Sequence, residues 1–152
     1  MISPNLLIGL KLLMAVACGG AIGFERELSR KPAGLRTNVL ICVGAALFMI
    51  VSRHIGGGAP YTDPARLVAQ VVTGIGFIGA GVILQSRGSI SGLTSAATIF
   101  VVSAVGITIG EGMFTVAFDD HTTYHCGAGV SAKGRARLRA APPAVSLSAE
   151  DN

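Results

Sequence analysis

The stretch FERELSRKPAGLRT, residues 24–37, decides how this chain is organised. It carries four basic residues and two glutamates, and long apolar runs lie on both sides of it. Short basic segments between apolar runs are typical of loops that connect two membrane-spanning helices. The stretch therefore predicts a loop at a membrane surface, and the rest of the chain can be placed relative to it.

The composition points to a bilayer as the solvent. Of the 152 residues, 51% are hydrophobic and only 13% are charged, and the mean hydropathy is +0.64. A soluble domain normally carries about a quarter charged residues. The net charge of +4 does not indicate a nucleic-acid partner, because most basic residues lie between apolar runs or in the last thirty residues. These charges are interpreted as topology signals.

Four apolar runs are long enough to cross the hydrocarbon, which takes about 20 helical residues. They cover Leu6 to Phe24, Leu35 to Ser52, Asp63 to about Gln85, and Leu93 to about Gly110. A further run, Met113 to Phe118, is ended by aspartates after about six residues, far short of a span. The sequence thus predicts an all-α, polytopic transmembrane bundle with four spans and an incomplete fifth.

Two predictions concern helix packing. Gly19 and Gly23 form a GxxxG pair, and so do Gly106 and Gly110; such pairs allow the backbones of neighbouring helices to approach closely. The third run carries four glycines within the eight residues 74–81, so we expect its helix to be central and the most enclosed. Lys11 interrupts the first run and is expected to extend towards an interface.

Lysine and arginine counts predict the orientation. The first loop carries four such residues and the third loop carries Arg87, whereas Arg53 and Arg66 flank the second loop. The first and third loops are therefore expected in the cytoplasm, with the N-terminus outside.

Residues 119–152 change character and are predicted to be a disordered, non-native tail after a membrane domain of residues 1–118. His121, His125 and Cys126 have metal-ligand chemistry at helical spacing, but a disordered tail makes a poor metal site. Cys18 and Cys42 lie inside apolar runs and behave there as small hydrophobic residues. The three cysteines indicate neither a disulfide framework nor a zinc site.

Three ordered blocks of the chain resemble the N-terminal membrane domain of the MgtC/SapB family. The blocks are GFERE followed by KPAGLRT in residues 23–37, DPAR followed by AQVVTGIGFIGAG in residues 63–81, and GLTSAAT in residues 92–98. The resemblance covers roughly Leu6 to Phe114 and implies a bacterial inner-membrane protein. Some members carry Asn at the position of Thr94 and Cys at that of Val101, so roles attached to those side chains do not transfer.

The resemblance also implies a function. It suggests a protein linked to magnesium limitation, acid stress and survival inside host cells, with a regulatory role that includes restraint of the ATP synthase. Members usually have a fifth membrane helix, and some have a soluble C-terminal domain. We therefore expect this chain to be truncated or frame-shifted near Phe118, which resequencing of the locus would test.

Candidate functional residues fall into three groups. The first is a polar cluster in the cytoplasmic loop that could bind a cation or a partner: Glu25, Arg26, Glu27, Lys31 and Arg36. The second is Asp63 with Arg66, expected to cap and pair at the start of the third helix. The third comprises intramembrane polar and packing residues: Gln70, Thr73, Gly74, Gly76, Gly79, Gly81 and Thr94.

Two of these groups have an alternative interpretation. The loop cluster could be only interfacial charge, with Glu27 and Lys31 as a solvated i, i+4 pair. Gln70 and Thr73 could face a polar cavity or form hydrogen bonds between helices.

The favoured function is a non-catalytic modulator that lies in the bilayer and acts on a second copy of itself or on another membrane protein, the ATP synthase included. The alternatives are a component of a magnesium or other cation transporter, and a non-functional remnant. Glu25 and Asp63 are weak candidates for binding Mg²⁺ because a helix of about 30 Å separates them. No motif of an enzyme was found in the sequence.

Overall fold

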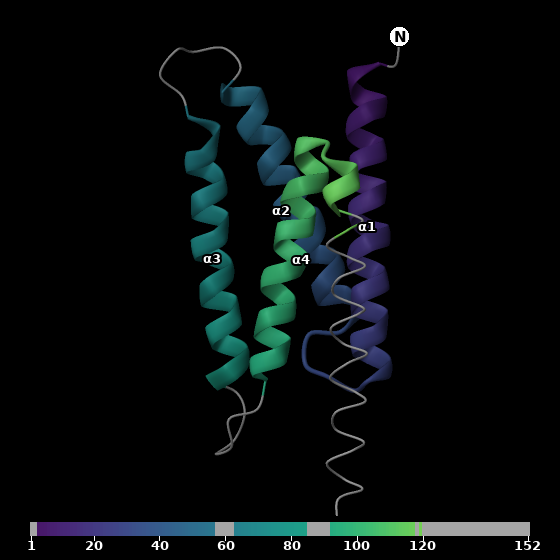
Figure 1. Ribbon diagram of the computed structural model, residues 1–152, viewed down its shortest axis with the longest axis vertical. Helices are drawn as coiled ribbons and strands as arrows, with labels where there is room; N and C mark the ends of the chain where they lie inside the picture. The colour runs from purple at the N-terminus through teal and green to yellow at the C-terminus, as the bar shows by residue number, and fades with distance from the viewer. Residues whose placement is uncertain (1–2, 57–62, 85–91, 118, 120–152) are drawn as a thin grey trace, which may run out of the picture. The chain divides into compact units, whose positions relative to one another are not determined.

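The four apolar runs form four helices in a computed structural model that describes residues 3–56, 63–84, 92–117 and 119. The helices are α1 (Pro4–Leu28), α2 (Leu35–Gly56), α3 (Pro64–Leu84) and α4 (Leu93–Glu111). All four are long and apolar enough to cross a membrane. The predicted all-α transmembrane architecture is therefore confirmed, and successive helices run in opposite directions (Figure 1).

Local sequence signals fix the helix ends. Proline occupies the first position of α1 and of α3, where the missing N–H removes no hydrogen bond. Asp63 Oδ1 accepts a hydrogen bond from Ala65 N at 2.9 Å, which confirms the predicted cap of α3. Gly92 (φ 94°) precedes α4 and Gly112 (φ 97°) follows it, both in the left-handed region that glycine adopts without strain.

Both GxxxG pairs are packing surfaces. A Cβ built on Gly19 would lie 2.8 Å from the carbonyl oxygen of Asn38, and one on Gly23 would lie 2.7 Å from Leu35 Cα. A Cβ on Gly110 would lie 2.6 Å from the carbonyl oxygen of Ala46. Glycine is thus required where α1 meets α2 and where α4 meets α2, as the spacing predicts.

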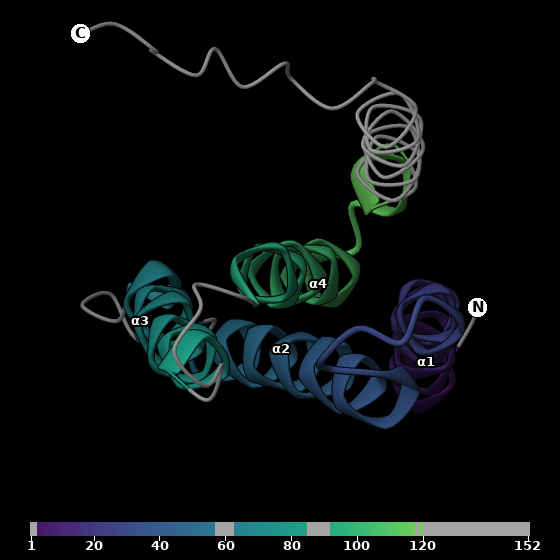
Figure 2. The same cartoon turned by 90° about the horizontal axis from the view of Figure 1, so that it is seen from below.

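The expectation that the third helix is the most enclosed was wrong. Half of the α4 span is buried, against 11% of the α3 span. Ile99, Val102, Val105 and Ile109 of α4 are fully buried, and α4 packs against all three other helices (Figure 2). Glycines in a membrane helix usually indicate close approach of another helix. Most glycines of α3 have no such neighbour within the described chain. The glycine content therefore did not identify the central helix of the bundle.

Several expectations lie outside the described residues. The disordered tail, its histidines and Cys126, and the loops around Gly57 to Thr62 and Gln85 to Ser91 belong to these. After Gly112, residues 114–117 form a further helical turn within the run that was predicted to be an incomplete fifth span.

Candidate functional site

Charged and polar side chains gather at the two ends of the bundle. We call one the Glu25 end; it holds residues 25–38 and the first turns of α4. We call the other the Glu111 end; it holds Lys11, Arg53, Asp63 and the last turn of α4.

The Glu27 carboxylate of α1 bonds to the start of α2, at the far end of the loop that connects the two helices. Glu27 Oε2 accepts a hydrogen bond from Leu35 N at 3.0 Å and so caps the start of α2, where the helix dipole favours negative charge. Gly34 lies against this carboxylate, since a Cβ there would be 3.1 Å from Glu27 Oε2. The alternative interpretation paired Glu27 with Lys31; in the described residues α1 ends at Leu28 and the Glu27 carboxylate contacts the start of α2.

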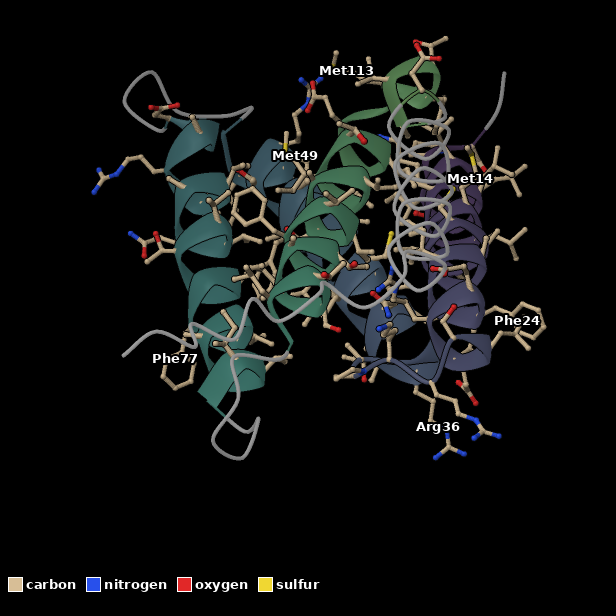
Figure 3. All side chains as sticks on the ribbon, turned by 60° about the horizontal axis from the view of Figure 1, so that its bottom comes forward. Met14, Phe24, Arg36, Met49, Phe77 and Met113 are labelled. Atoms are coloured by element: carbon tan, nitrogen blue, oxygen red, sulfur yellow. The ribbon has the colours of Figure 1, made fainter. Side chains whose placement is uncertain are left out.

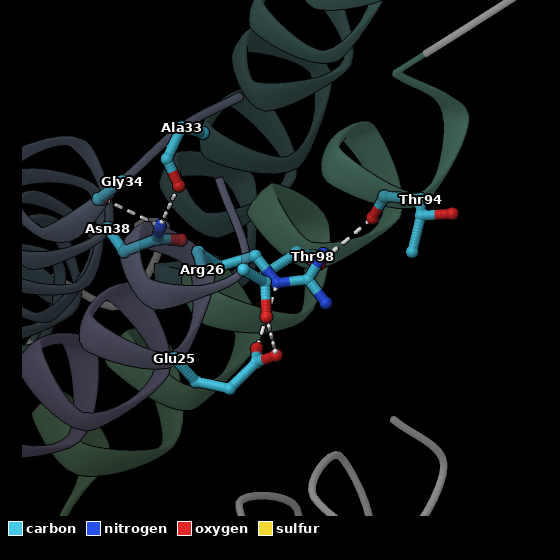
Figure 4. A network of polar contacts seen from close by, with 8 residues as sticks. Glu25, Arg26, Ala33, Gly34, Asn38, Thr94 and Thr98 are labelled. Atoms are coloured by element: carbon cyan, nitrogen blue, oxygen red, sulfur yellow. Dashed lines mark hydrogen bonds and ion pairs between the residues drawn. The ribbon is translucent and has the colours of Figure 1, made fainter. Parts of the chain in front are cut away.

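Arg26 points into the bundle, unlike the rest of the predicted loop cluster. The residue is only 5% exposed, and its Nε lies 3.1 Å from Glu25 Oε2. Ser29 Oγ donates to the other oxygen of Glu25 at 3.0 Å. Figure 4 shows the Arg26 side chain extending from α1 towards Thr98 of α4. A buried guanidinium beside a carboxylate anchors this end, because a lone charge in a low-dielectric interior is costly.

Asn38 ties the start of α2 to the loop before it. The residue is fully buried, and its Nδ2 donates to the carbonyl oxygens of Ala33 at 2.6 Å and Gly34 at 2.9 Å (Figure 4). Ser95 and Thr98 are also buried nearby along the first turns of α4. Three helices therefore contribute buried polar groups to the Glu25 end, whereas Glu27, Lys31 and Arg36 remain exposed.

The sequence placed Arg26 in the loop cluster and Asn38 within the second apolar run, but it did not show that both are buried. The helical spacing of each residue relative to the glycine pairs could have predicted that it is buried. The buried face of α1 is Ala15, Cys18, Gly19, Ile22, Gly23 and Arg26. The buried face of α2 starts at Asn38 and continues at the spacing of one face through Cys42, Ala45, Met49 and Ser52. Each polar residue extends a face that the GxxxG positions already define.

At the Glu111 end, two cations hold the last turn of α4. Lys11 Nζ donates to the carbonyl oxygen of Gly110 at 2.7 Å, and Arg53 Nη1 lies 2.5 Å from Glu111 Oε1. Cations complement the negative end of a helix dipole. Lys11 was expected to extend towards an interface; it is instead half-buried and bonds to α4. Sequence reasoning gave Lys11, Arg53 and Glu111 no site role.

A cavity of 440 Å³ lies at the Glu111 end between α2, α3 and α4. Arg53, Asp63, Thr108 and Glu111 supply its polar lining. Glu111 Oε2 is buried and accepts no hydrogen bond from the described residues. Among those residues, no three His, Cys, Asp or Glu side chains gather in a way that could hold a metal ion.

The predicted intramembrane group on α3 is spread around an open helix. Gln70, Thr73 and Gly74 are exposed, and Thr73 Oγ1 donates to the Ala69 carbonyl oxygen of its own helix at 3.0 Å. A Cβ built on Gly74, Gly76 or Gly81 would meet nothing within 4 Å, whereas one built on Gly79 would lie 3.6 Å from Ala96 Cβ of α4. Phe77 projects outwards and is 84% exposed (Figure 3).

Two further predicted residues, Thr94 and Arg66, are exposed at the starts of α4 and α3. Thr94 is exposed at the start of α4, and its carbonyl oxygen accepts the Thr98 hydroxyl at 2.9 Å. Arg66 is exposed and its backbone N–H donates to the Asp63 carbonyl at 3.1 Å. No ion pair joins Arg66 to Asp63 in the part of the chain that the structure describes.

Comparison with known proteins gives the family. The model of the MgtC family matches residues 12–121, which includes every helix after the first two turns of α1. This chain belongs to the MgtC family. The matched residues include the Glu25 end and all of α3.

Curated relatives agree with this assignment. YhiD of Escherichia coli K12 is 53% identical over 113 residues, which is 68% of this chain and 50% of YhiD. MgtC of Brucella abortus is 45% identical over 103 residues, 68% of this chain and 42% of the relative. A Haemophilus influenzae protein is 46% identical over 117 residues, 71% of this chain and 48% of the relative. The chain spans about half the length of the relatives it matches. No solved structure matches it significantly.

Proposed function

We propose that this MgtC-family chain is a non-catalytic modulator of the bacterial inner membrane that acts by contact with membrane proteins. The observation that carries the proposal is the position of the carboxylates. Within α1 to α4 and their caps, every carboxylate lies at a bundle end and has a partner there: Glu25 with Arg26, Glu27 with Leu35 N, Asp63 with Ala65 N, and Glu111 with Arg53.

This placement argues against an ion pathway through the four-helix unit. Mg²⁺ takes oxygen ligands in near-octahedral order and gives up water reluctantly. Transporters place such ligands and other ionisable groups near the bilayer midplane. The 22 residues of α2 separate the Glu25 end from the Glu111 end by about 33 Å. Glu25 and Asp63 therefore serve two separate surfaces.

The Glu25 end is the surface proposed for partner contact. Its exposed Glu27, Lys31 and Arg36 surround the loop, while Arg26 and Asn38 hold that loop in place from beneath. The excess of basic residues supports a cytoplasmic location for this end. The proposed roles are those that the family resemblance implies: adaptation to magnesium limitation and acid stress, intracellular survival, and restraint of the ATP synthase.

A transporter component is the second candidate. The name of the YhiD relative in Escherichia coli K12 proposes magnesium transport. In this chain, the cavity at the Glu111 end with Asp63 and Glu111 in its lining favours that candidate. A third candidate is a non-functional remnant, and it is refuted if the chain accumulates in membranes and changes the behaviour of a partner.

Reconstitution into liposomes with a magnesium-sensitive dye separates the first two candidates. A modulator gives the same dye signal as protein-free liposomes. Protein-dependent flux that falls in Glu25→Ala or Asp63→Ala would overturn the proposal, and Asp63→Asn is the matched control because an amide oxygen still caps α3. Co-purification of an ATP synthase subunit, lost when Lys31 and Arg36 are both changed to Ser, would support it.

A further inference from the structure

We propose that a groove between α2 and α3 is the surface on which a second copy of this chain docks, about a two-fold axis along the membrane normal that pairs Gln70 with Gln70 of the other copy. This surface goes beyond the proposed function, because it lies on the lipid-facing side of α2 and α3 and not on the charged loop of the Glu25 end. Each of the two proposals can therefore fail alone.

The groove has a volume of 600 Å³ and is lined by α2 and α3 alone. Gly44 of α2 and Gly74 of α3 both line it, and a Cβ on either would meet nothing within 4 Å. The other helix pairs in this bundle use their glycines differently, since Gly19, Gly23 and Gly110 lie directly against a neighbouring backbone or side chain. In a membrane, small residues permit close packing with another helix. Within the described chain, no other helix packs against Gly44 or Gly74 of this groove.

A polar side chain in the same groove provides the second observation. Gln70 lines the groove and is exposed, and no hydrogen bond joins its amide to any described residue. It lies six residues into a span of about 31 Å, so its Cα is about 9 Å from the start of α3. Hydrocarbon offers an amide no hydrogen-bond partner, and leaving the group unpaired there is unfavourable. The groove thus needs an occupant with a polar group at that depth.

A second copy supplies that group. Two copies inserted in the same orientation hold Gln70 at the same depth, and a two-fold axis along the membrane normal then brings the two side chains together. A glutamine amide has both donors and an acceptor, so two of them can satisfy each other reciprocally. Gly74 is one turn from Gln70 and would lie close to the same axis, where its lack of a side chain lets the α3 helices approach.

Disulfide crosslinking between copies tests the pairing in native membranes. Gly74→Cys and Gly76→Cys are matched variants of a Cys126→Ser parent that keeps the buried Cys18 and Cys42. A Cβ at either position would meet nothing within 4 Å in the monomer, so the two variants have matched steric room. The two positions are about 200° apart around α3, and only Gly74 lines the groove. We expect a crosslinked product of twice the chain mass at Gly74→Cys, at several-fold higher yield than at Gly76→Cys.

The contribution of the Gln70 amide to dimer formation is tested in the same Cys126→Ser, Gly74→Cys chain. Gln70→Leu should raise the dissociation constant of the dimer about 3-fold to 30-fold and lower the Gly74→Cys yield accordingly. Thr73→Val is the control, because the Thr73 hydroxyl already bonds within its own helix. Equal crosslinking at the two glycine positions, no product of twice the mass at Gly74→Cys, or no effect of Gln70→Leu would each overturn the proposal. None of these results bears on the magnesium-flux assay.

Discussion

Gly106→Ala is expected to push α4 away from α2. A Cβ on Gly106 would fall against the backbone carbonyl oxygen of Cys42 and lie 2.9 Å from Ala45 Cβ, closer than real Cβ contacts occur. The carbonyl belongs to a helix backbone and cannot rotate aside, so the helices must separate. Overpacking of this kind typically costs about 1–3 kcal/mol. Because α4 contacts all three other helices, the loss should lower the stability of the whole bundle.

Gly76→Ala isolates this steric effect. It makes the same chemical change on a helix, but the new methyl group meets nothing within 4 Å. Any gain from the higher helix propensity of alanine, up to about 1 kcal/mol, is therefore common to both variants. Unfolding of the purified protein by SDS in mixed micelles, followed by circular dichroism, gives the two free energies of unfolding. The reasoning is refuted if Gly106→Ala is as stable as Gly76→Ala.

Three further substitutions can be measured by the same unfolding assay. Lys11→Met should cost about 1.5–3 kcal/mol because it removes a charged hydrogen bond to the Gly110 carbonyl, and Lys11→Arg should retain most of that stability. Asn38→Ala loses two hydrogen bonds to the α1–α2 loop and should cost about 2 kcal/mol; an unchanged midpoint would contradict that role. Asp63→Ala should cost about 1 kcal/mol through loss of the α3 cap, and equal losses in Asp63→Ala and Asp63→Asn would argue against capping.

The four spans could be predicted because length and hydropathy respond directly to the bilayer, although α1 and α2 each extend four residues past their predicted ends at Phe24 and Ser52. The predicted starts at Leu35 and Leu93 coincide with those of α2 and α4. The relative burial of the helices could not be predicted, because lipid and a protein interior select the same apolar side chains. Glycine did not resolve it either: Gly106 lies against α2, whereas Gly76 has no neighbour.

The candidate site was predicted in part. The sequence located the charges of the Glu25 end and the Asp63 cap, since both depend on local chain chemistry. It did not separate buried Arg26 from exposed Arg36, because that difference depends on which face of α1 meets α2 and α4. The hydrogen-bond partners of Lys11 and Arg53 could not be predicted either, because each bonds to a residue of α4 that is remote in sequence.

The central position of α4 has a consequence for biogenesis. This helix is the last of the four to leave the ribosome, yet it supplies the fully buried Ile99, Val102, Val105 and Ile109. The α1–α2 hairpin can close as soon as it is inserted, through Gly19 and Gly23. The contacts that α4 makes with the other three helices must wait until residues up to Glu111 are in the bilayer. A nascent chain that stops before α4 is therefore an open set of helices, exposed to quality-control proteases until α4 is inserted.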